Sequence, residues 1–541
     1  MERTRGDDAM EGTGLTKHLG GIALAAVLAL GLTALPAQAD TIRVPQDEPT
    51  IQDGVDTAVD GDTVLVKKGG GSGTNGDYLE NVLIKGKSIT LKCKNGAVID
   101  AGQTKATISG TDYSAGVTVE EDVDGDTDGT RIEGCTIKNA QNCDSSLDES
   151  EPVCSNNFDD GDGIDVGGSH VDGVEIVRNT FIGNERAGLW LVGDECLISR
   201  NTALDNKEIG IFAECDNSIA SIDRNKVQGS SKDGLLVEGD NNTVDRNTAE
   251  NNKKRGIKVE GDDNEVTNNL ASTNGENNIE VNGDRNKISR NVALHGGKEG
   301  FKIDGDEVTV ERNLSLGNAK RGYRLKDTGS SGWIIDRNRA SNNGEHGVEL
   351  LGLFQGEFTR NRLLRNAQFG VLCSKNEGGC DESELSHNTI KGNGKGGFRC
   401  DDCSDNTFDG NNIRDNHGDG LNLQHDSDDN VIKNNKISRN AGDGIDLDQP
   451  GPAIGDTCGS DNKLINNRVT RNSQTGVEND CVDTDMEGNT VTNNGAIDLA
   501  GEGSCGEGNV DSFTGNNIGT GTTTTTSPNT GPEDPKDANC P

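Results

Sequence analysis

The sequence predicts an all-β fold, a parallel β-solenoid whose coils take about 22 residues each. First, the motif Asn-x-apolar, often preceded by Arg, recurs along most of the chain. Sequence periods of this length indicate stacked repeats. Second, only 3% of the residues are aromatic and 75 of the 541 are Gly, which argues against a conventional large core. Third, the apolar residues of each unit lie in short alternating runs, which are typical of strands.

Each coil is expected to contain three short strands joined by turns. In one unit the inward positions are Val244, Ala249, Ile257 and Val259, and polar turns separate them. Helices are not expected in the coils, because β-branched residues favour strands while Gly and Asn favour turns. Parallel stacking would place equivalent residues of successive coils about 4.8 Å apart.

One Asn and one Gly of each coil are expected to be structural. Asn247 can exchange amide hydrogen bonds with the Asn above and below it, which satisfies buried backbone groups. Gly256 precedes the third strand, where a turn would require positive φ or a close backbone approach. The Asn series comprises Asn179, Asn201, Asn225, Asn247, Asn269, Asn291, Asn313, Asn338, Asn361, Asn388, Asn411, Asn435, Asn467 and Asn489.

The N-terminus has the pattern of an export signal. The apolar run "IALAAVLALGLTAL" is followed by A-Q-A ending at Ala39, so residues 1–39 are predicted to be a cleaved signal peptide. Translation can begin at Met1 or at Met10. No later apolar run approaches the roughly 20 residues of a membrane span. We therefore expect no membrane span in the mature chain and a secreted, extracellular or periplasmic location.

The segment "TIRVPQDEPTIQDGVDTAVDGDTVLV" (residues 41–66), with the repeat that follows, resembles the right-handed parallel β-helix superfamily. This superfamily comprises the pectin-lyase-like proteins and includes exported bacterial proteins of the NosD-like type. The resemblance covers about residues 41–519 and implies a right-handed coil with a short helix at about residues 50–59 over its open end. The implied organisation is a β-helix domain (40–519) with an N-terminal strand and cap helix (40–66) and an acidic disulfide loop (140–162), followed by a Thr/Pro-rich tail (520–541).

Charge limits the expected partners. The net charge is −40 and the isoelectric point is about 4.5, so long-range repulsion opposes binding to nucleic acid. A polysaccharide or a cell-surface component is the expected partner, and the sequence leaves the oligomeric state open. The three Met and seven His are scattered, which argues against the copper-delivery role of some relatives.

The catalytic motifs of known relatives are not present in register. Polysaccharide hydrolases of this superfamily carry N-T-D, D-D, G-H-G and R-I-K on successive coils. Here "DGDGIDV" (160–166) and "AGDGIDL" (441–447) imitate the first motif, but the chain contains no G-H-G and no D-P-H-D of alginate epimerases. A scaffold without turnover is therefore favoured over an enzyme.

A candidate glycan site lies on the last coils. Carboxylates, a cation, amides and an imidazole would lie there within a few strand spacings, as a site with a paired acid and base requires. Asp and Asn are also common in the turns of all the coils, so a purely structural role for these residues is the alternative. The candidate catalytic residues are Asp401, Asp446 and Asp448, and the candidate substrate-binding residues are Arg399, Asn422, Gln424, His425 and, on an earlier coil, Trp190.

The outward position of the third strand forms a stripe along the coils. The charges in its middle, as at Lys258, Glu280 and Lys302, alternate in sign, which predicts a ladder of ion pairs on a solvated face. At the N-terminal end of the stripe, Trp190, Phe212 and Leu236 form an apolar patch. This patch would either stack on sugar rings or lie under the loop near Cys143.

One acidic loop has the spacing of a calcium site, which makes Ca²⁺ a candidate cofactor. Its oxygen ligands would occupy positions 1, 3, 5, 7 and 12 of a loop similar to an EF-hand. Thr127 stands where that loop needs Gly, so a solvated acidic loop is the alternative. The candidate ligands are Asp122, Asp124, Asp126, Asp128 and Glu133.

Fourteen cysteines in an exported chain indicate disulfides. A C-x₂-C pair at residues 400 and 403 also permits a four-thiolate zinc site, although export favours disulfides. The expected pairs are Cys143 with Cys154, Cys196 with Cys215, and Cys458 with Cys481. A further four, Cys373, Cys380, Cys400 and Cys403, would pair either locally or across neighbouring coils.

Two functions follow from the sequence. The first is a secreted or surface scaffold that binds a glycan or another surface partner without turnover. The alternative is a polysaccharide lyase, hydrolase or epimerase that uses the face from Asp401 to Asp448.

Overall fold

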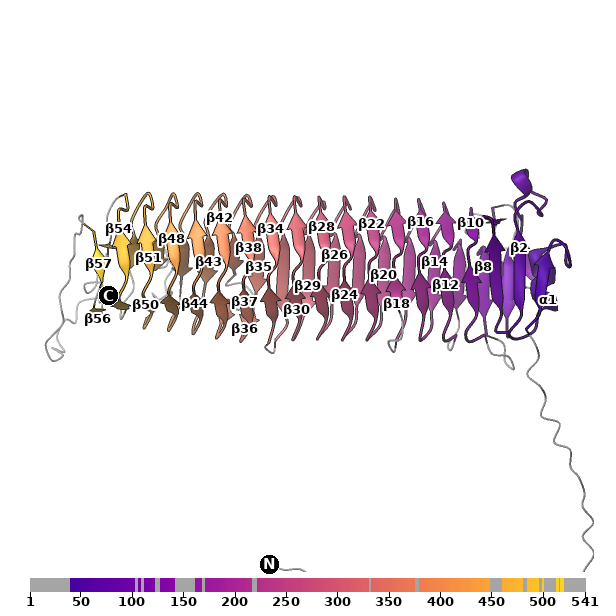
Figure 1. Cartoon of the computed structure of the whole chain (residues 1–541), viewed down its shortest axis with the longest axis horizontal. Helices are drawn as coiled ribbons and strands as arrows, with labels where there is room; N and C mark the ends of the chain where they lie inside the picture. Colours follow the sequence, from indigo (N-terminus) through magenta and orange to yellow (C-terminus); the bar gives the residue numbers. More distant parts are fainter. Residues whose placement is uncertain are drawn as a thin grey trace, which may run out of the picture. The chain divides into compact units, whose positions relative to one another are not determined.

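The computed structural model is a parallel β-solenoid, which confirms the fold predicted from the repeat (Figure 1). Residues 1–38, most of the acidic insertion and the tail from residue 520 lie outside the described part of the chain. The structure describes residues 39–102, 106–108, 111–121, 127–141, 161–167, 171–216, 221–329, 332–374, 379–425, 427–447, 460–479, 484–495, 499–500, 512–514 and 516–519.

A regular coil contributes one strand to each of three parallel sheets, called here sheets A, B and C. Within the described residues, sheet A has 19 strands and sheet B has 17. Successive coils pair in register, so Val244 lies opposite Val266 and Ile257 opposite Ile279. One coil consists of β21 (Thr243–Asp245) in sheet A, β22 (Thr248–Glu250) in sheet B and β23 (Ile257–Glu260) in sheet C, and the next of β24 (Glu265–Thr267), β25 (Leu270–Ser272) and β26 (Ile279–Asn282).

A short helix packs at the N-terminal end, as the resemblance implies. The helix α1 (Ile51–Thr57) lies in the chain between β1 (Thr41–Val44) and β2 (Thr63–Lys67). The Thr50 side chain accepts a hydrogen bond from the Asp53 amide and caps the helix. Ile51 and Val55 are buried in the core, so α1 covers apolar side chains of the first coils.

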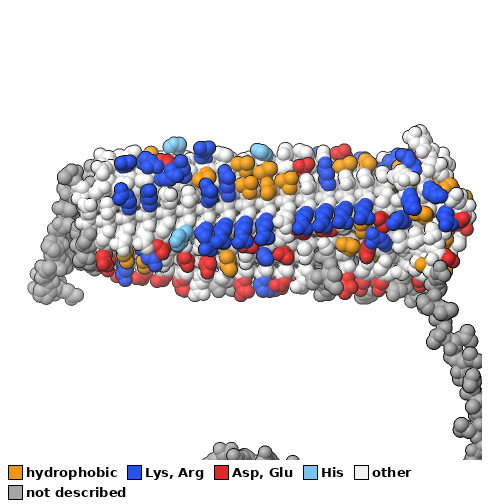
Figure 2. Space-filling model, viewed as in Figure 1, with side chains coloured by type: hydrophobic (Ala, Val, Ile, Leu, Met, Phe, Trp, Pro, Cys, Tyr) orange, Lys and Arg blue, Asp and Glu red, His pale blue; other side chains and the backbone are white. Residues whose placement is uncertain are grey.

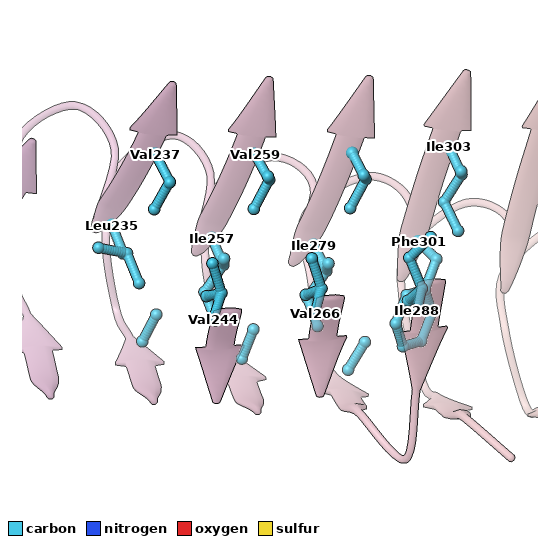
Figure 3. Packing of buried hydrophobic residues seen from close by; sticks show 14 of the residues in the cluster. Leu235, Val237, Val244, Ile257, Val259, Val266, Ile279, Ile288, Phe301 and Ile303 are labelled. Atoms are coloured by element: carbon cyan, nitrogen blue, oxygen red, sulfur yellow. The ribbon is translucent and has the colours of Figure 1, made fainter. Parts of the chain in front are cut away.

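The core is a narrow stack of layers, in which each coil contributes a few inward side chains, most of them aliphatic. Leu235, Val237, Val244, Ile257 and Val259 are all fully buried, and the same positions of the next coils lie beside them (Figure 3). This narrow core requires few large side chains, which accounts for the low aromatic content. The apolar surface of each coil is buried mainly by its two neighbours.

Buried Asn side chains connect the coils at the turn between sheets A and B, as predicted. The Asn247 amide nitrogen donates to the Ile222 carbonyl at 2.7 Å and to the Asn269 side chain at 3.1 Å. The Asn247 side-chain oxygen accepts from the Asn225 backbone amide at 2.9 Å and from its side chain at 3.0 Å. Each Asn thus satisfies backbone groups of the coils on either side.

A second Asn series lies at the turn after sheet B, and the sequence analysis did not identify it. Asn252 donates to Asn274 at 3.0 Å, and Asn343 donates to Asn366 at 2.9 Å. This series is interrupted by Ser230 and Gly296, which weakens its sequence signal. Asn side chains therefore connect successive coils at this corner as well.

Gly256 is required by a close approach and not by its backbone angle. Its φ is not positive, but a Cβ built on it would lie 2.4 Å from the Asn274 amide nitrogen and 2.6 Å from the Asn278 carbonyl oxygen. Of the two reasons considered from the sequence, close packing under the next coil is therefore the one that applies.

Replacing Asn247 with Ala should destabilise the solenoid, because buried partners in the coils on either side lose their hydrogen bonds. We expect the free energy of unfolding to fall by about 2–4 kcal/mol. Urea denaturation followed by far-ultraviolet circular dichroism measures this. The control is Lys226→Ala, an exposed change at the neighbouring coil, which should cost less than about 0.5 kcal/mol. Equal effects of the two changes would contradict a structural role for the Asn series.

Candidate functional site

The structure brings most residues of the predicted C-terminal site to one face of sheet C. Arg399 lies opposite Asn422, and Asn422 lies opposite Asp446. Asp401 lies opposite Gln424, and His425 follows directly. Asp448 lies outside the described residues. The strands are β43 (Phe398–Asp401), β46 (Leu421–Gln424), β49 (Ile445–Leu447) and β52 (Val477–Asn479).

The members of this site do not act as separate charges. The Arg399 guanidinium contacts the Asp401 carboxylate at 2.8 Å, so Asp401 is engaged in an ion pair. The Asn422 amide nitrogen donates to the Asp446 carboxylate at 2.6 Å. Asn422 and Asp446 are both more than nine-tenths buried. The predicted acid and base residues are therefore held by their neighbours.

Two further carboxylates, which the sequence analysis did not select, lie next to Asp446. Oxygen atoms of Asp419, Asp443 and Asp446 lie within 4.8 Å of one another. Asp419 and Asp443 each accept a backbone hydrogen bond from the following coil, from the amides of Asp443 and Thr475. Burial and the neighbouring Asp419 charge raise the pKa of Asp443. The motif G-D-G, repeated one coil apart in "HGDGLN" and "AGDGID", was the available signal.

The middle of the sheet C stripe carries the predicted ion pairs, but its Glu280 and Glu349 are buried and the face there is not the solvated one that was expected. Glu280 contacts Arg255 at 2.8 Å and Lys302 at 3.1 Å. Arg324 contacts Asp304 at 3.2 Å, and Glu349 contacts Arg321 at 2.7 Å. Charges on this part of the face are thus compensated within the protein.

Trp190 is enclosed on both faces of its indole ring. The Arg186 guanidinium carbon lies 3.7 Å from the ring centroid, and the Phe212 ring stacks with its centroid 3.9 Å away. Two groups this close to one centroid must occupy opposite faces. Phe212 and Leu236 are themselves buried. The patch is therefore packed within the protein in this structure, and sugar binding by Trp190 remains a prediction.

A buried imidazole lies near the start of the C-terminal face. The His346 ring stacks in parallel on Phe369 at 5.7 Å between centroids, and Lys395 and Arg399 each lie 5.8 Å from the same Phe ring. Burial, reinforced by the charges of Arg321 and Lys395, lowers the pKa of His346 to about 4.

The predicted calcium loop is described only in part. Asp122, Asp124 and Asp126 lie outside the described residues. The Glu133 carboxylate contacts Lys92 at 3.1 Å, Arg131 at 3.2 Å and Arg178 at 2.8 Å. Burial raises the pKa of Glu133, but the Lys92 and Arg131 contacts outweigh it and lower the pKa overall. Glu133 thus belongs to a cluster of ion pairs, and calcium binding with Asp128 remains a prediction.

The described residues contain four disulfides. Cys196 pairs with Cys215, as expected, and Cys93 pairs with Cys135, which the sequence analysis did not propose. The four-cysteine group forms two local bridges, so the alternative pairing across coils is not the one observed. Their sulfur atoms lie within 4.8 Å of one another. Cys143, Cys154, Cys458 and Cys481 lie outside the described residues, and the two local bridges are Cys373–Cys380 and Cys400–Cys403.

The outer face of sheet B carries a cationic groove that the sequence analysis missed. A pocket of about 310 Å³ lies across four neighbouring strands. Its lining contains cations, polar groups and Leu364, but no carboxylate and no imidazole. The strands are β34 (Arg339–Ser341), β38 (Arg362–Leu364), β42 (Thr389–Lys391) and β45 (Asn412–Arg414), and the cations are Arg339, Arg362, Arg365, Lys391 and Arg414.

Three arginines of this cationic groove have no carboxylate partner among the described residues. Arg339, Arg362 and Arg365 are exposed and form no ion pair there. Lys391 and Arg414 share one acid, Asp415, at 3.6 and 2.9 Å.

Asp415 also contacts Arg439 at 2.7 Å, and this guanidinium lowers the pKa of Asp415. Further exposed cations continue the same face on β48 (Lys436–Ser438) and β51 (Arg468–Thr470). Figure 2 shows blue side chains outnumbering red ones on this upper part of the C-terminal coils. A strongly acidic chain thus presents a local cationic surface.

No helix in the described ranges is long and apolar enough to cross a membrane. The model of a family described as "Right handed beta helix region" matches residues 115–271, 192–332, 233–381 and 378–523. The chain belongs to the right-handed β-helix family. The resemblance inferred from the sequence is thereby confirmed.

Solved structures similar to this right-handed β-helix chain include polysaccharide-active proteins. No curated protein matches it in sequence. The A-module of Azotobacter vinelandii mannuronan C-5 epimerase AlgE6 is 16% identical, with 64% of this chain and 91% of that chain covered and a TM-score of 0.35. For the periplasmic alginate epimerase AlgG these values are 14%, 66%, 79% and 0.27. For the catalytic domain of a GH87 α-1,3-glucanase in complex with nigerose they are 11%, 90%, 70% and 0.30.

Acidification should destabilise the fold through His346. The unfolded chain protonates this side chain near pH 6.5 and the folded protein only near pH 4. His346 therefore does not reduce the free energy of unfolding above about pH 6.5. Below that pH the free energy of unfolding falls as the pH drops toward 4. At pH 5 we expect a loss of about 2 kcal/mol from this residue. Urea denaturation at pH 7.5 and pH 5 measures it.

The control for this pH dependence is His346→Asn, which removes the titrating group. The difference in stability between the two pH values should shrink by the same amount in that variant. An unchanged difference would show that other groups cause the acid sensitivity.

Proposed function

We propose that this protein is an exported scaffold that binds an acidic glycan in the cationic groove of sheet B without turning it over. The observation that carries the proposal is the set of three arginines, Arg339, Arg362 and Arg365, that have no acidic partner among the described residues of a chain with net charge −40. Where acids outnumber bases, an uncompensated cluster of this kind favours a ligand that supplies the anions.

Arginine is suited to carboxylates and sulfates. Its planar guanidinium donates two parallel hydrogen bonds to a carboxylate, which gives direction as well as affinity. Three neighbouring strands place Arg339 and Arg362 opposite one another and Lys391 on the next coil. A polymer with regularly spaced acidic groups can engage several of these side chains at once.

The groove favours binding over catalysis. Glycoside hydrolysis requires paired carboxylates, and proton abstraction requires a general base near the substrate. The groove is lined by Arg, Lys, Ser, Asn, Thr and Leu. These side chains hold an anion but do not supply the acid and base pair of that chemistry.

An exported location is part of the same proposal. Cys93–Cys135 and three further disulfides stabilise the described coils, and disulfides persist in oxidising compartments. The partner is then a polysaccharide of the surroundings or a component of a cell surface.

The second candidate is a polysaccharide-active enzyme on sheet C. Oxygen atoms of Asp419, Asp443 and Asp446 lie within 4.8 Å of one another, and a raised pKa such as that of Asp443 is a property of general acids. On this hypothesis Asp443→Asn would abolish cleavage or epimerisation of a polyuronate, while the groove variants below would only weaken binding. Product formation by the native protein would favour the enzyme over the scaffold.

Removing two groove arginines should weaken glycan binding. The variant Arg339→Ser/Arg362→Ser removes two charge-assisted contacts from exposed positions, so we expect the Kd for short galacturonate or mannuronate oligomers to rise about 10- to 100-fold. Isothermal titration calorimetry at low and moderate salt measures the change, and the salt dependence should also decrease.

The matched control is Lys226→Ser, an exposed cation on an N-terminal strand of sheet B. It should leave the Kd within about twofold. Unchanged affinity in the groove variant, or equal loss in both variants, would refute binding at this groove.

A further inference from the structure

A line of arginines runs along the turn between sheets A and B. Eight of nine consecutive coils, from Arg178 to Arg360, place Arg at the same turn position, and Asn268 is the exception. Figure 2 shows this line as two runs of blue side chains separated by one gap. We call these eight residues the arginine ladder. Successive members lie about 4.8 Å apart, because they occupy equivalent positions of paired strands.

The backbone at this position does not favour Arg. Every ladder residue has positive φ, between 53° and 58°, a region that suits Gly and Asn better than a long side chain. The corresponding turn after sheet B has the same backbone conformation over these coils. It carries a mixture there, including Asp205, Asn251, Thr273, His295 and Asn342. The solenoid therefore does not require Arg at such a turn.

The guanidiniums of the ladder remain accessible. Six of the eight contact a carboxylate, but 43% to 55% of each of their side chains is exposed: Arg178, Arg224, Arg246, Arg312, Arg337 and Arg360. Arg200 and Arg290 form no ion pair with any described residue. Exposed ion pairs of this kind are weak, so a ligand with several anionic groups can displace them.

The ladder reaches the cationic groove. Arg337 and Arg360 each precede a groove arginine by two residues, Arg339 and Arg362, on the same coils. A ligand held in the groove can thus continue along the ladder toward the N-terminal coils.

We propose that the arginine ladder binds a linear acidic polysaccharide that lies parallel to the solenoid axis, with one anionic group for each coil. This inference rests on the proposed function, and it adds the orientation, the repeat and the length of the ligand. The polymer carries one carboxylate or sulfate on each sugar unit, and its spacing matches the coil rise of about 4.8 Å.

The spacing and composition favour a glycan over a nucleic acid. Duplex DNA carries one charge for each ~1.7 Å of its axis, which is far denser than one charge per coil. Single-stranded nucleic acid is held largely by stacking on aromatic side chains, and the groove and the ladder contain none.

The test measures affinity as a function of ligand length. Galacturonate and mannuronate oligomers of two to twelve units are titrated into the intact protein. The affinity should increase with length until the oligomer spans the groove and the ladder, at about ten units or more from the coil rise. The double variant Arg200→Asn/Arg290→Asn should weaken binding of the longest oligomers about tenfold and leave that of the shortest unchanged.

Asn is a safe replacement because Asn268 already occupies the same turn in one coil of the ladder. The reverse change, Asn268→Arg, fills the gap and should raise the affinity for long oligomers about threefold. A fold defect would lower the affinity in both variants, so opposite effects exclude that explanation.

The possible failures are distinguishable. If short oligomers bind and require Arg339 and Arg362, but length and the ladder variants have no effect, the ladder proposal is wrong and the groove function stands. If no acidic oligomer binds, the proposed function is wrong as well. A single-stranded oligonucleotide that binds more tightly than any glycan, with the same dependence on Arg200 and Arg290, would overturn the assignment to a polysaccharide.

Discussion

The hydrogen bonding between successive coils is the constraint on which the rest of this structure depends. A single coil buries too little apolar surface to fold alone, and its turns leave backbone groups that water cannot reach once coils stack. Asn247 and its equivalents satisfy those groups by donating to one coil and accepting from another. This fixes the register, because a shift by one residue would remove every such contact and turn the aliphatic residues outward.

A fixed register aligns the outward residues in rows. The charges of neighbouring side chains within each row therefore interact directly. Identical charges repeated about 4.8 Å apart repel one another. On sheet C this repulsion is avoided where the charges alternate in sign, as in the ion pair of Glu280 and Lys302. In the cationic groove, Arg339 and Arg362 face each other across adjacent strands and no described acid pairs with either. Because like charges in one row repel unless opposite charges compensate them, the uncompensated groove favours an anionic ligand.

The repeat made the fold predictable, whereas the sites depended on contacts between coils. The Asn period identified the solenoid, and Val244 and Ile257 marked its inward layer. The cationic groove combines residues from four coils. In the sequence of any one coil, its Arg is an ordinary exposed residue at a variable position of the repeat. The Cys93–Cys135 bridge was missed because 42 residues separate the two cysteines, so the regular period does not place them on neighbouring coils. Gly256 was selected correctly, but only the packed structure showed that crowding, and not positive φ, excludes a side chain there.

The acidity of the chain and its cationic face act together. The chain has a net charge of −40, which repels a polyanion from the protein surface outside the groove and the ladder. A small anion gains little from one arginine, because an exposed contact is weak and an internal acid such as Asp245 competes for the ladder. A long polymer in register with the coils gains from many arginines at once, and each additional contact forms at high effective concentration. The same arrangement thus excludes short or irregular anions and selects a regular acidic chain.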